Sequence, residues 1–513
     1  MKNLTKYGLI SIVLLSLLIT PGVNAAEIKF DPKSQIQVEI LESNWIRDPS
    51  YLAIRQTSRT SSSDSETFLC EQWGSGNCPS TRTDIDVSYF GTVILPICSQ
   101  EGSTYCIEKL EIKEQGGDWV SQRFMRSIAG PTRKAIPEIG YPLSGTISLF
   151  SPTSHDQSRG VDGYGVFASL EVNFDPRVDK KVKLSYLDLR VAPYSTQHGD
   201  FTAQSVSTSL NSTGKYGVQF RTIRENYVWE EDDLAGFAEQ FSSDVAVRLA
   251  VRVPSTLSGW LSGRLSHAEF AVTPFSSQIN RLVVGGNPVE VGRVIANVDR
   301  NNPPEFFKSK IAQNPINQRF GYRGSNGVFD VLESVKAVME DKSIAEELRW
   351  GVGTYTNSEA TCVSGKPSIV GMVSTNASVF DAIAPTFRNG VLKYRVGGLH
   401  FRSDGKLTLG QYDLVLRSDE ARCLYGYSNA PVQATVSLRY SNGEPLLATA
   451  TVNESSGWLH IGAYNFSFSN PTIEVRLKQE TKNRKSTIIC LKGDLIKKVT
   501  AINPKCPKGY KKK

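Results

Sequence analysis

Two neighbouring segments, Gln433-Ala-Thr-Val-Ser-Leu-Arg-Tyr440 and Leu446-Leu-Ala-Thr-Ala-Thr-Val452, decide the fold class of this chain. Apolar and polar side chains alternate in each segment, which is the pattern of a β-strand with one buried face. Asn442-Gly443 lies between them and supplies the positive φ angles of a tight hairpin turn. Residues 391–477 contain six such runs, and we predict that they form the antiparallel meander of a β-sandwich.

Strand-like alternation also dominates the rest of the chain. It extends over residues 36–40, 87–97, 107–112, 164–174, 181–191 and 245–253. The apolar positions change parity inside residues 181–191 and again inside residues 458–468, which predicts a β-bulge in each strand. The predicted fold class is therefore all-β, with antiparallel β-sandwich domains.

Three segments depart from this pattern and predict short helices. Glu230-Glu-Asp-Asp233 precedes an apolar run, and acidic residues are favoured at a helix N-terminus. Apolar residues recur every three or four positions between Val328 and Met339, which indicates an amphipathic helix. Ser343-x-x-Glu346 has the form of a capping box, so we expect a further short helix to begin there.

Changes in composition divide the chain into five segments. We predict a signal peptide (1–25), an N-terminal β-rich region (26–296) that could divide near residue 145, a linker with two short helices (297–350), a C-terminal β-sandwich (351–477) and a disulfide-closed basic tail (478–513). The boundary after residue 296 depends on Pro303-Pro304, on Pro315 and on several Asn and Gly residues nearby.

The first residues have the pattern of a secretory signal. Lys2 and Lys6 precede an apolar run from Leu9 to Ile19, and small residues lead to Ala25. The run is shorter than the roughly 20 apolar residues that a transmembrane anchor needs. We therefore expect a secreted protein without a transmembrane anchor that is retained at the cell envelope.

The positive charge of the chain is concentrated at its C-terminus. Of the net charge of +7, residues 478–513 contribute +10 and residues 1–25 contribute +2, so residues 26–477 carry −5. This distribution and the expected export both argue against nucleic acid as a partner. We predict a hairpin around Gly493-Asp494 whose lysines bind an anionic envelope polymer. The lysines concerned are Lys497, Lys498, Lys505, Lys508, Lys511, Lys512 and Lys513.

Eight cysteines in an exported chain indicate disulfides. Their grouping along the chain predicts the pairs Cys70–Cys78, Cys98–Cys106, Cys362–Cys423 and Cys490–Cys506, although eight cysteines allow 105 connectivities. We expect the second pair to close the tip of a hairpin between residues 87–97 and 107–112. A zinc site is the weaker interpretation, because no Cys-x-x-Cys occurs and the five histidines do not cluster with cysteines.

No catalytic motif stands out in the sequence. Ser212-x-x-Lys215 has the spacing of penicillin-binding enzymes but lacks the companion Lys-Thr-Gly, and no Gly-x-Ser-x-Gly or His-Glu-x-x-His occurs. We therefore predict no catalytic or metal-binding residues and no cofactor. Calcium is the one alternative, since Asp84-Ile-Asp86 and Glu230–Asp233 offer oxygen ligands; the simpler interpretation is a solvated turn and a helix start.

Aromatic and basic residues near the C-terminal strands are candidates for ligand binding. Tyr425, Tyr427, Trp458 and Tyr464 could form a platform on which a sugar ring stacks, although aromatic residues in strands more often belong to the core. Arg417 and Arg422 either bind an anionic group or are simply solvated.

Two long segments carry a resemblance. Arg417-Ser-Asp-Glu-Ala-Arg-Cys-Leu-Tyr-Gly-Tyr-Ser-Asn-Ala-Pro431 together with Gly457-Trp-Leu-His-Ile-Gly-Ala-Tyr-Asn-Phe-Ser-Phe468 resembles a domain of large exported β-rich actinobacterial proteins. Residues 489–513 are similar to a basic two-cysteine tag at the C-terminus of such proteins, and Gly259-Trp-Leu-Ser-Gly-Arg264 is a third, shorter similarity. This uncharacterised family implies an actinobacterial source and export, and it implies no reaction.

Two functions remain open at this point. The first is an exported cell-envelope or surface protein without enzymatic activity, acting in adhesion or glycan binding. The alternative is a secreted hydrolase acting on a polysaccharide or a peptide. The absence of catalytic motifs favours the first function.

Overall fold

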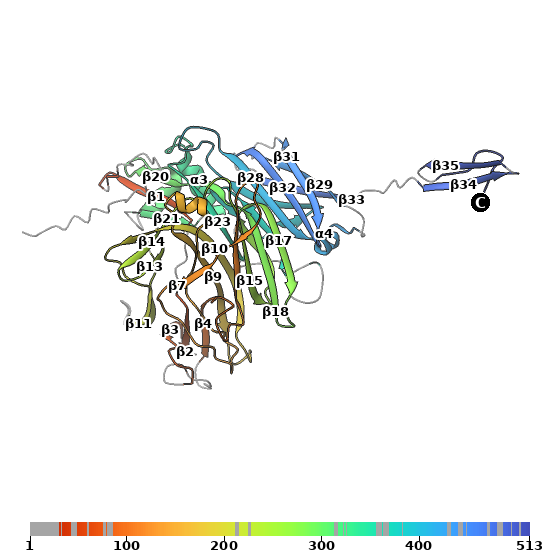
Figure 1. Cartoon of the computed structure of the whole chain (residues 1–513). Helices are drawn as coiled ribbons and strands as arrows, with labels where there is room; N and C mark the ends of the chain where they lie inside the picture. Colours follow the sequence, from red (N-terminus) through yellow and green to blue (C-terminus); the bar gives the residue numbers. More distant parts are fainter. Residues whose placement is uncertain are drawn as a thin grey trace, which may run out of the picture.

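The structure is a computed structural model of the whole chain. It describes residues 30–31, 33–42, 49–58, 61–74, 78, 86–210, 215–223, 227–311, 317–321, 323–324, 326–354, 362, 369–381, 383–427, 432–439, 445–447, 449–468, 472–479, 486–493, 495–501 and 504–513. Strands dominate these residues, and the four helices among them are short, so the predicted all-β class is confirmed (Figure 1). None of the helices in this described part is long and apolar enough to cross a membrane.

One large sheet runs through most of the molecule (Figure 1). Its strands in spatial order are β3 (Ser61–Leu69), β2 (Tyr51–Ser58), β4 (Asp86–Ile94), β9 (Gly163–Phe174), β10 (Lys183–His198), β23 (Glu346–Thr354), β16 (Gly259–Arg264), β24 (Ile369–Thr375), β28 (Leu409–Arg417), β32 (Trp458–Ser467) and β31 (Thr449–Ser455). Five short strands join its margins: β7 (Phe124–Ser127), β8 (Ser148–Phe150), β13 (Tyr227–Glu230), β14 (Leu234–Ala238) and β19 (Val289–Gly292). We call it the main sheet.

A five-stranded sheet packs against one half of the main sheet. It contains β17 (Ser266–Pro274), β18 (Ile279–Asn287), β15 (Ala246–Pro254), β5 (Cys106–Lys113) and β6 (Val120–Ser121). The largest hydrophobic cluster joins Leu249 and Val284 of this sheet to Val166 and Leu189 of the main sheet. This half of the molecule is therefore a β-sandwich.

A seven-stranded sheet packs against the other half of the main sheet and forms the C-terminal sandwich. Its strands are β22 (Arg323–Gly324), β25 (Val379–Asp381), β26 (Thr386–Arg388), β27 (Val391–Gly397), β33 (Thr472–Gln479), β29 (Val432–Arg439) and β30 (Pro445–Leu447). Val396 and Val475 of this sheet lie in one cluster with Leu414 and Ile461 of the main sheet.

The predicted six-strand meander is wrong, because the C-terminal strands alternate between the two sheets. β30 pairs with β29 in the seven-stranded sheet, whereas β31 pairs with β32 in the main sheet. The chain thus changes sheet between β30 and β31 (Thr449–Ser455), inside a run that alternates without interruption in the sequence. Asn442-Gly443 lies outside the described residues, between the antiparallel strands β29 and β30.

Smaller elements cover the remaining surfaces. β20 (Val294–Asp299), β1 (Gln35–Leu41) and β21 (Asn317–Gly321) form a three-stranded sheet, and β11 (Ser205–Leu210) pairs with β12 (Tyr216–Arg221). The helices are α1 (Ser154–Ser158), α2 (Glu305–Ile311), α3 (Asn326–Lys336) and α4 (Ser418–Tyr425). Val331 and Leu332 of α3 pack against Val38 of β1 and Val298 of β20, so the helix predicted from its periodicity is confirmed.

Both predicted β-bulges are present. In β10 the register to β9 shifts between Ser185 and Asp188, and Tyr186 between them has φ of 56°. In β32 the register to β28 shifts at Asn465, whose φ is 62°. An extra residue in the left-handed region is how a strand moves its apolar side chains to the other face.

Two predicted helices are wrong. Residues 227–238 form the hairpin of β13 and β14, because Tyr227, Trp229 and Phe237 are buried together against the main sheet. Ser343 donates a hydrogen bond to the Glu346 carboxylate, which is a contact between two side chains and not the side chain to backbone bonding of a capping box, and residues 346–354 are the central strand β23. Their place between β10 and β16 outweighs the local helix signal. The two helices before the C-terminal sandwich are α2 and α3.

The main sheet continues across the linker predicted at residues 297–350. β23 follows α3 in the chain and pairs with β10 and β16 from the predicted N-terminal region. Arg264 of β16 also donates to the carboxylate of Glu42, next to β1, and to the carbonyls of Thr375 and Ala377 after β24. Strands from both sides of the predicted linker therefore belong to one sheet, and buried polar contacts join them.

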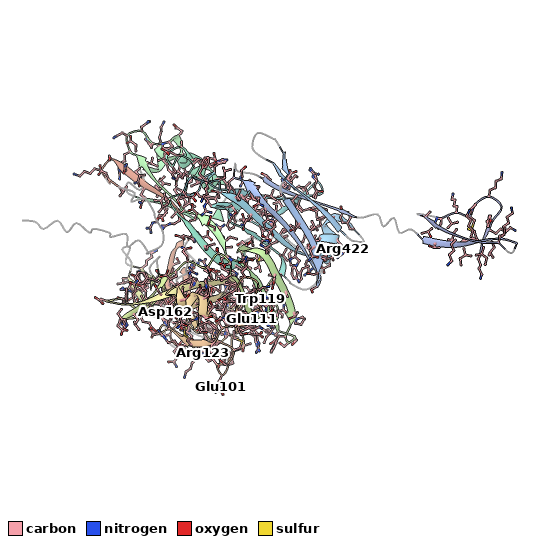
Figure 2. The ribbon with its side chains drawn as sticks, turned by 45° about the horizontal axis from the view of Figure 1, so that its top comes forward. Glu101, Glu111, Trp119, Arg123, Asp162 and Arg422 are labelled. Atoms are coloured by element: carbon pink, nitrogen blue, oxygen red, sulfur yellow. A yellow bond between two sulfur atoms is a disulfide. The ribbon has the colours of Figure 1, made fainter. Side chains whose placement is uncertain are left out.

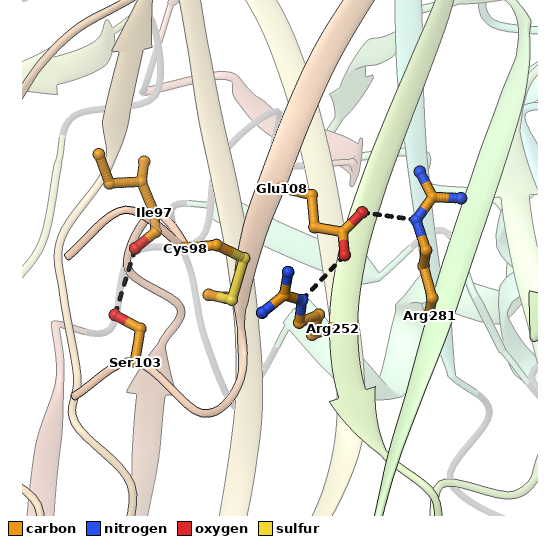
Figure 3. Close-up of a disulfide and its surroundings, with 7 residues drawn as sticks. Ile97, Cys98, Ser103, Glu108, Arg252 and Arg281 are labelled. Carbon is orange, nitrogen blue, oxygen red and sulfur yellow. Dashed lines mark hydrogen bonds and ion pairs between the residues drawn. A yellow bond between two sulfur atoms is a disulfide. The ribbon is translucent and has the colours of Figure 1, made fainter. Parts of the chain in front are cut away.

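Four disulfides join Cys70 to Cys78, Cys98 to Cys106, Cys362 to Cys423 and Cys490 to Cys506, the pairs that the spacing predicts. The Cys98–Cys106 bridge does not close a hairpin, because β4 belongs to the main sheet and β5 to the five-stranded sheet. It links the two ends of the segment by which the chain passes from the main sheet to the five-stranded sheet. Glu108 lies beside it and accepts hydrogen bonds from Arg252 and Arg281 (Figure 3).

Candidate functional site

The basic tail is a small sheet with its own strand pairing. β34 (Ser486–Lys492) pairs with β35 (Leu495–Ala501) on one side and with β36 (Lys511–Lys512) on the other. The predicted hairpin is therefore present, and Gly493 in its turn has φ of 56°. Both Figure 1 and Figure 2 draw this sheet apart from the two sandwiches.

The disulfide of the tail is its core. Cys490 is fully buried, whereas Leu495 and Ile496 are 62% and 69% exposed. A sheet of three short strands has little apolar area to bury, so a covalent link supplies what the core cannot. The Cys490–Cys506 bridge fixes the segment after β35 against the middle strand, and β36 then pairs with that same strand.

The strand register distributes the lysines over both faces of the tail. Lys497 and Lys512 both lie opposite Cys490, so their side chains leave from the same face as that cysteine. Lys498 lies opposite Ile489 and Lys511 opposite Leu491, so these two leave from the other face. Figure 2 shows side chains projecting on both sides of this sheet.

The seven tail lysines, defined as Lys497, Lys498, Lys505, Lys508, Lys511, Lys512 and Lys513, are all exposed. None of them forms an ion pair with a described acidic residue. Their charges therefore remain available to an anionic partner. Lys497 and Lys498 lie on β35 and Lys511 and Lys512 on β36, whereas Lys505 and Lys508 lie in the segment that joins these two strands.

The structure does not bring the four candidate stacking residues together. The rings of Tyr425 and Tyr427 stack at 5.7 Å. Trp458 packs edge-on against Phe270 at 4.7 Å, and only 6% of it is exposed. Tyr464 stacks on His267 at 4.9 Å. Glycan stacking on these residues stays a prediction.

Tyr425 and Tyr427 have a structural role at the edge of β33. Their hydroxyls donate to the carbonyl oxygens of Val475 and Leu477, where the pairing of β27 with β33 ends, since Val475 opposite Leu392 is the last paired residue. Burial raises the pKa of Tyr425 above its usual value. The two side chains therefore satisfy backbone acceptors of β33 near the end of its pairing with β27.

The arginines considered as anion ligands are paired with acids. Arg422, labelled in Figure 2, contacts both carboxylate oxygens of Glu454, and Arg417 contacts Asp419. Asp84 of the calcium alternative lies outside the described residues. Glu231 of the other acidic segment forms a two-bond ion pair with Arg126. In the described part of the chain, His, Cys, Asp and Glu form no group of three or more that could hold a metal.

Asp413 of β28 is a buried acid that belongs to no sequence motif. Tyr464 donates a hydrogen bond of 2.7 Å to its carboxylate, and 7% of the residue is exposed. Burial raises the pKa of Asp413 to about 6, although the Tyr464 hydroxyl and the charge of His267 oppose this. A raised pKa is typical of catalytic acids, but a carboxyl enclosed to this degree offers a substrate little access.

No family model, curated protein or solved structure matches this chain. The candidate site is therefore defined by its own geometry. That geometry is a compact, disulfide-closed frame carrying seven exposed lysines, none of which pairs with an acidic residue of the described part of the chain.

Proposed function

We propose that this chain is an exported cell-envelope protein without enzymatic activity, which the seven tail lysines hold at the anionic polymers of the envelope. The observation that carries the proposal is the lack of acidic partners for these lysines among the described residues. Positive charge collected on one rigid frame attracts polyanions more strongly than the same charge spread along a flexible chain. The four disulfides are compatible with an extracellular location.

The two sandwiches then form the part that the tail displays at the surface. The sequence of the two sandwiches contains none of the catalytic motifs considered above, which supports a role in adhesion or glycan binding. The resemblance to exported actinobacterial proteins supports the same direction, since their C-terminal segments carry a similar basic tag.

The experiment measures binding of the purified protein to isolated Gram-positive cell walls. The wild type is compared with a variant in which all seven tail lysines are Gln, and with a second variant in which they are Arg. We expect the Gln variant to lose wall binding and the Arg variant to keep it, because Arg preserves the charge. Binding of the wild type should fall between 0.1 M and 1 M salt, where the screening length drops from about 10 Å to about 3 Å.

Walls stripped of their anionic polymers give the specificity control. The wild type should bind them no better than the Gln variant binds intact walls. Equal binding of the wild type and the Gln variant to intact walls at low salt would show that the tail does not retain the protein.

A further inference from the structure

A second group of cations lies on the outer face of the C-terminal sandwich. β26 and β27 form a hairpin in which Arg388 lies opposite Val391, with Asn389 and Gly390 as the turn. Both turn residues have positive φ, 53° and 72°, as a two-residue hairpin turn requires. The turn therefore fixes the position of the Arg388 backbone.

The pairing of β27 with β33 adds two more cations beside this hairpin. Lys393 lies directly opposite Glu474, and Arg476 is two residues further along β33. Lys393 contacts one carboxylate oxygen of Glu474 at 2.9 Å, and Arg476 lies 3.4 Å from the other. Glu474 is 2% exposed, so one buried carboxylate holds both cations in place.

These residues surround an open hollow of about 570 Å³. Arg388, Lys393, Arg476 and Glu474 line it, and Thr386 and Asn389 belong to its wall. Three cations face one carboxylate, which leaves a local charge of +2. The side chain of Arg388 has no hydrogen-bond or ion-pair partner among the described residues. The hollow therefore combines excess positive charge, two cations held by Glu474, and a guanidinium that has no partner among the described residues.

We propose that this hollow binds one anionic group, a carboxylate or a phosphate, of an envelope polysaccharide. The guanidinium groups of Arg388 and Arg476 offer the paired N–H donors that match either group. The hydroxyl of Thr386 and the amide of Asn389 can bond to sugar hydroxyls beside it. The volume is within the range of sites for small ligands.

This inference rests on the proposed function and specifies it. The tail supplies attraction that depends on charge alone, whereas the hollow has a shape and fixed donors and can select a polymer. Two contacts on one chain strengthen each other, because the first raises the effective concentration of the second.

The test uses the full chain with the seven tail lysines changed to Gln, so that the tail no longer contributes. Arg388→Gln is added to this background, and Arg123→Gln is the matched control, since Arg123 is exposed on the other sandwich and labelled in Figure 2. The probes are polygalacturonate, which carries carboxylates, its methyl ester, which is neutral, and a glycerol-phosphate polymer. Calorimetric titration measures the Kd of each variant.

We expect the tail-silenced chain to bind one of the two anionic probes and not the neutral ester. Arg388→Gln should weaken that binding about 10-fold to 100-fold, the range for one hydrogen bond to a charged group, and Arg123→Gln should leave it unchanged. The probe that binds identifies the group as carboxylate or phosphate. If the tail-silenced chain binds neither anionic probe, or binds equally with Gln at position 388, the inference is overturned.

The outcomes also separate the two proposals. Loss of wall binding on silencing the tail, with no probe binding left, sustains the tail and refutes the hollow. Wall binding that is as strong in the tail-silenced chain as in the wild type, and that disappears with Arg388→Gln, refutes the tail and sustains the hollow.

Discussion

Asp413→Asn should change how the stability of this protein depends on pH. Asp413 lies on β28, where it accepts a hydrogen bond from the Tyr464 hydroxyl. An asparagine has nearly the same shape, its side-chain oxygen can accept that same hydrogen bond, and it cannot ionise. The substitution therefore removes one titration and leaves the packing around the site nearly unchanged.

The magnitude follows from the pKa of this carboxyl. It is about 6 in the folded protein and 3.8 at its ordinary value. Because the folded pKa is the higher one, the folded state holds a proton that the unfolded chain releases between about pH 4 and pH 6. The free energy of unfolding therefore falls as the pH rises through this window, by about 3 kcal/mol for about two pKa units.

Asp413→Asn lacks this loss, so it should be more stable than the wild type above pH 7 by up to about 3 kcal/mol and equal to it below about pH 4. For a cooperative unit of roughly 450 residues, this corresponds to a rise in Tm of about 3 °C at pH 8. Scanning calorimetry from pH 4 to pH 8 measures it.

Comparing the variant with the wild type separates the contribution of Asp413 to the pH dependence of stability from that of His460. Burial lowers the pKa of His460, so its contribution to stability falls as the pH drops below 6.5, in the opposite direction. Asp330→Asn, an exposed aspartate on α3, is the control. If Asp413→Asn shows the same Tm profile as the wild type from pH 4 to pH 8, the carboxyl is not buried as the structure shows.

Three further substitutions test the packing. Replacing Cys362 and Cys423 by Ser should lower the free energy of unfolding by about 4 kcal/mol in urea, since the bridge spans 61 residues; non-reducing peptide mapping that finds both thiols free would contradict the pairing. Arg264→Met should cost about 3–5 kcal/mol, because it leaves the Glu42 carboxylate buried without its partner, and adding Glu42→Gln should recover part of this; no recovery would mean that the two are not coupled. Gly371→Ala should lower Tm by several degrees, since a Cβ there would lie 2.4 Å from a carbonyl oxygen of β28, and an unchanged Tm would contradict that close approach.

The fold class could be predicted because it depends on local patterns of apolar and polar residues. Leu249 and Val251 alternate with polar neighbours, and both are buried in β15. The parity change near Tyr186 predicts a bulge from sequence alone, since no unbulged strand can bury both apolar sets on one face. Such signals need no knowledge of which strand lies alongside.

The partners of the strands could not be predicted in this way. Residues 446–452 alternate as a single strand, but the chain changes sheet within them. Ser343 and Glu346 have the spacing of a capping box, but they stand at the start of a strand, because β23 pairs with both β10 and β16. Helix α4 shows the converse. Its αL cap at Gly426 and the acids in its first turn are local signals from which a helix could be predicted.

The two candidate anion sites also differ in whether they depend on local sequence or on strand pairing. The tail lysines are neighbours in the sequence, so their cluster of positive charge can be predicted without knowing the fold. Arg388 and Lys393 are also close in the sequence, but their site is completed by Glu474 and Arg476, which only the pairing of β27 with β33 brings beside them. A site made by long-range pairing exists only while the sandwich is folded, whereas exposed lysines attract anions in any conformation. Urea should therefore abolish polymer binding at the hollow at the concentration that unfolds the sandwich, and binding that persists beyond that concentration would have to come from the tail.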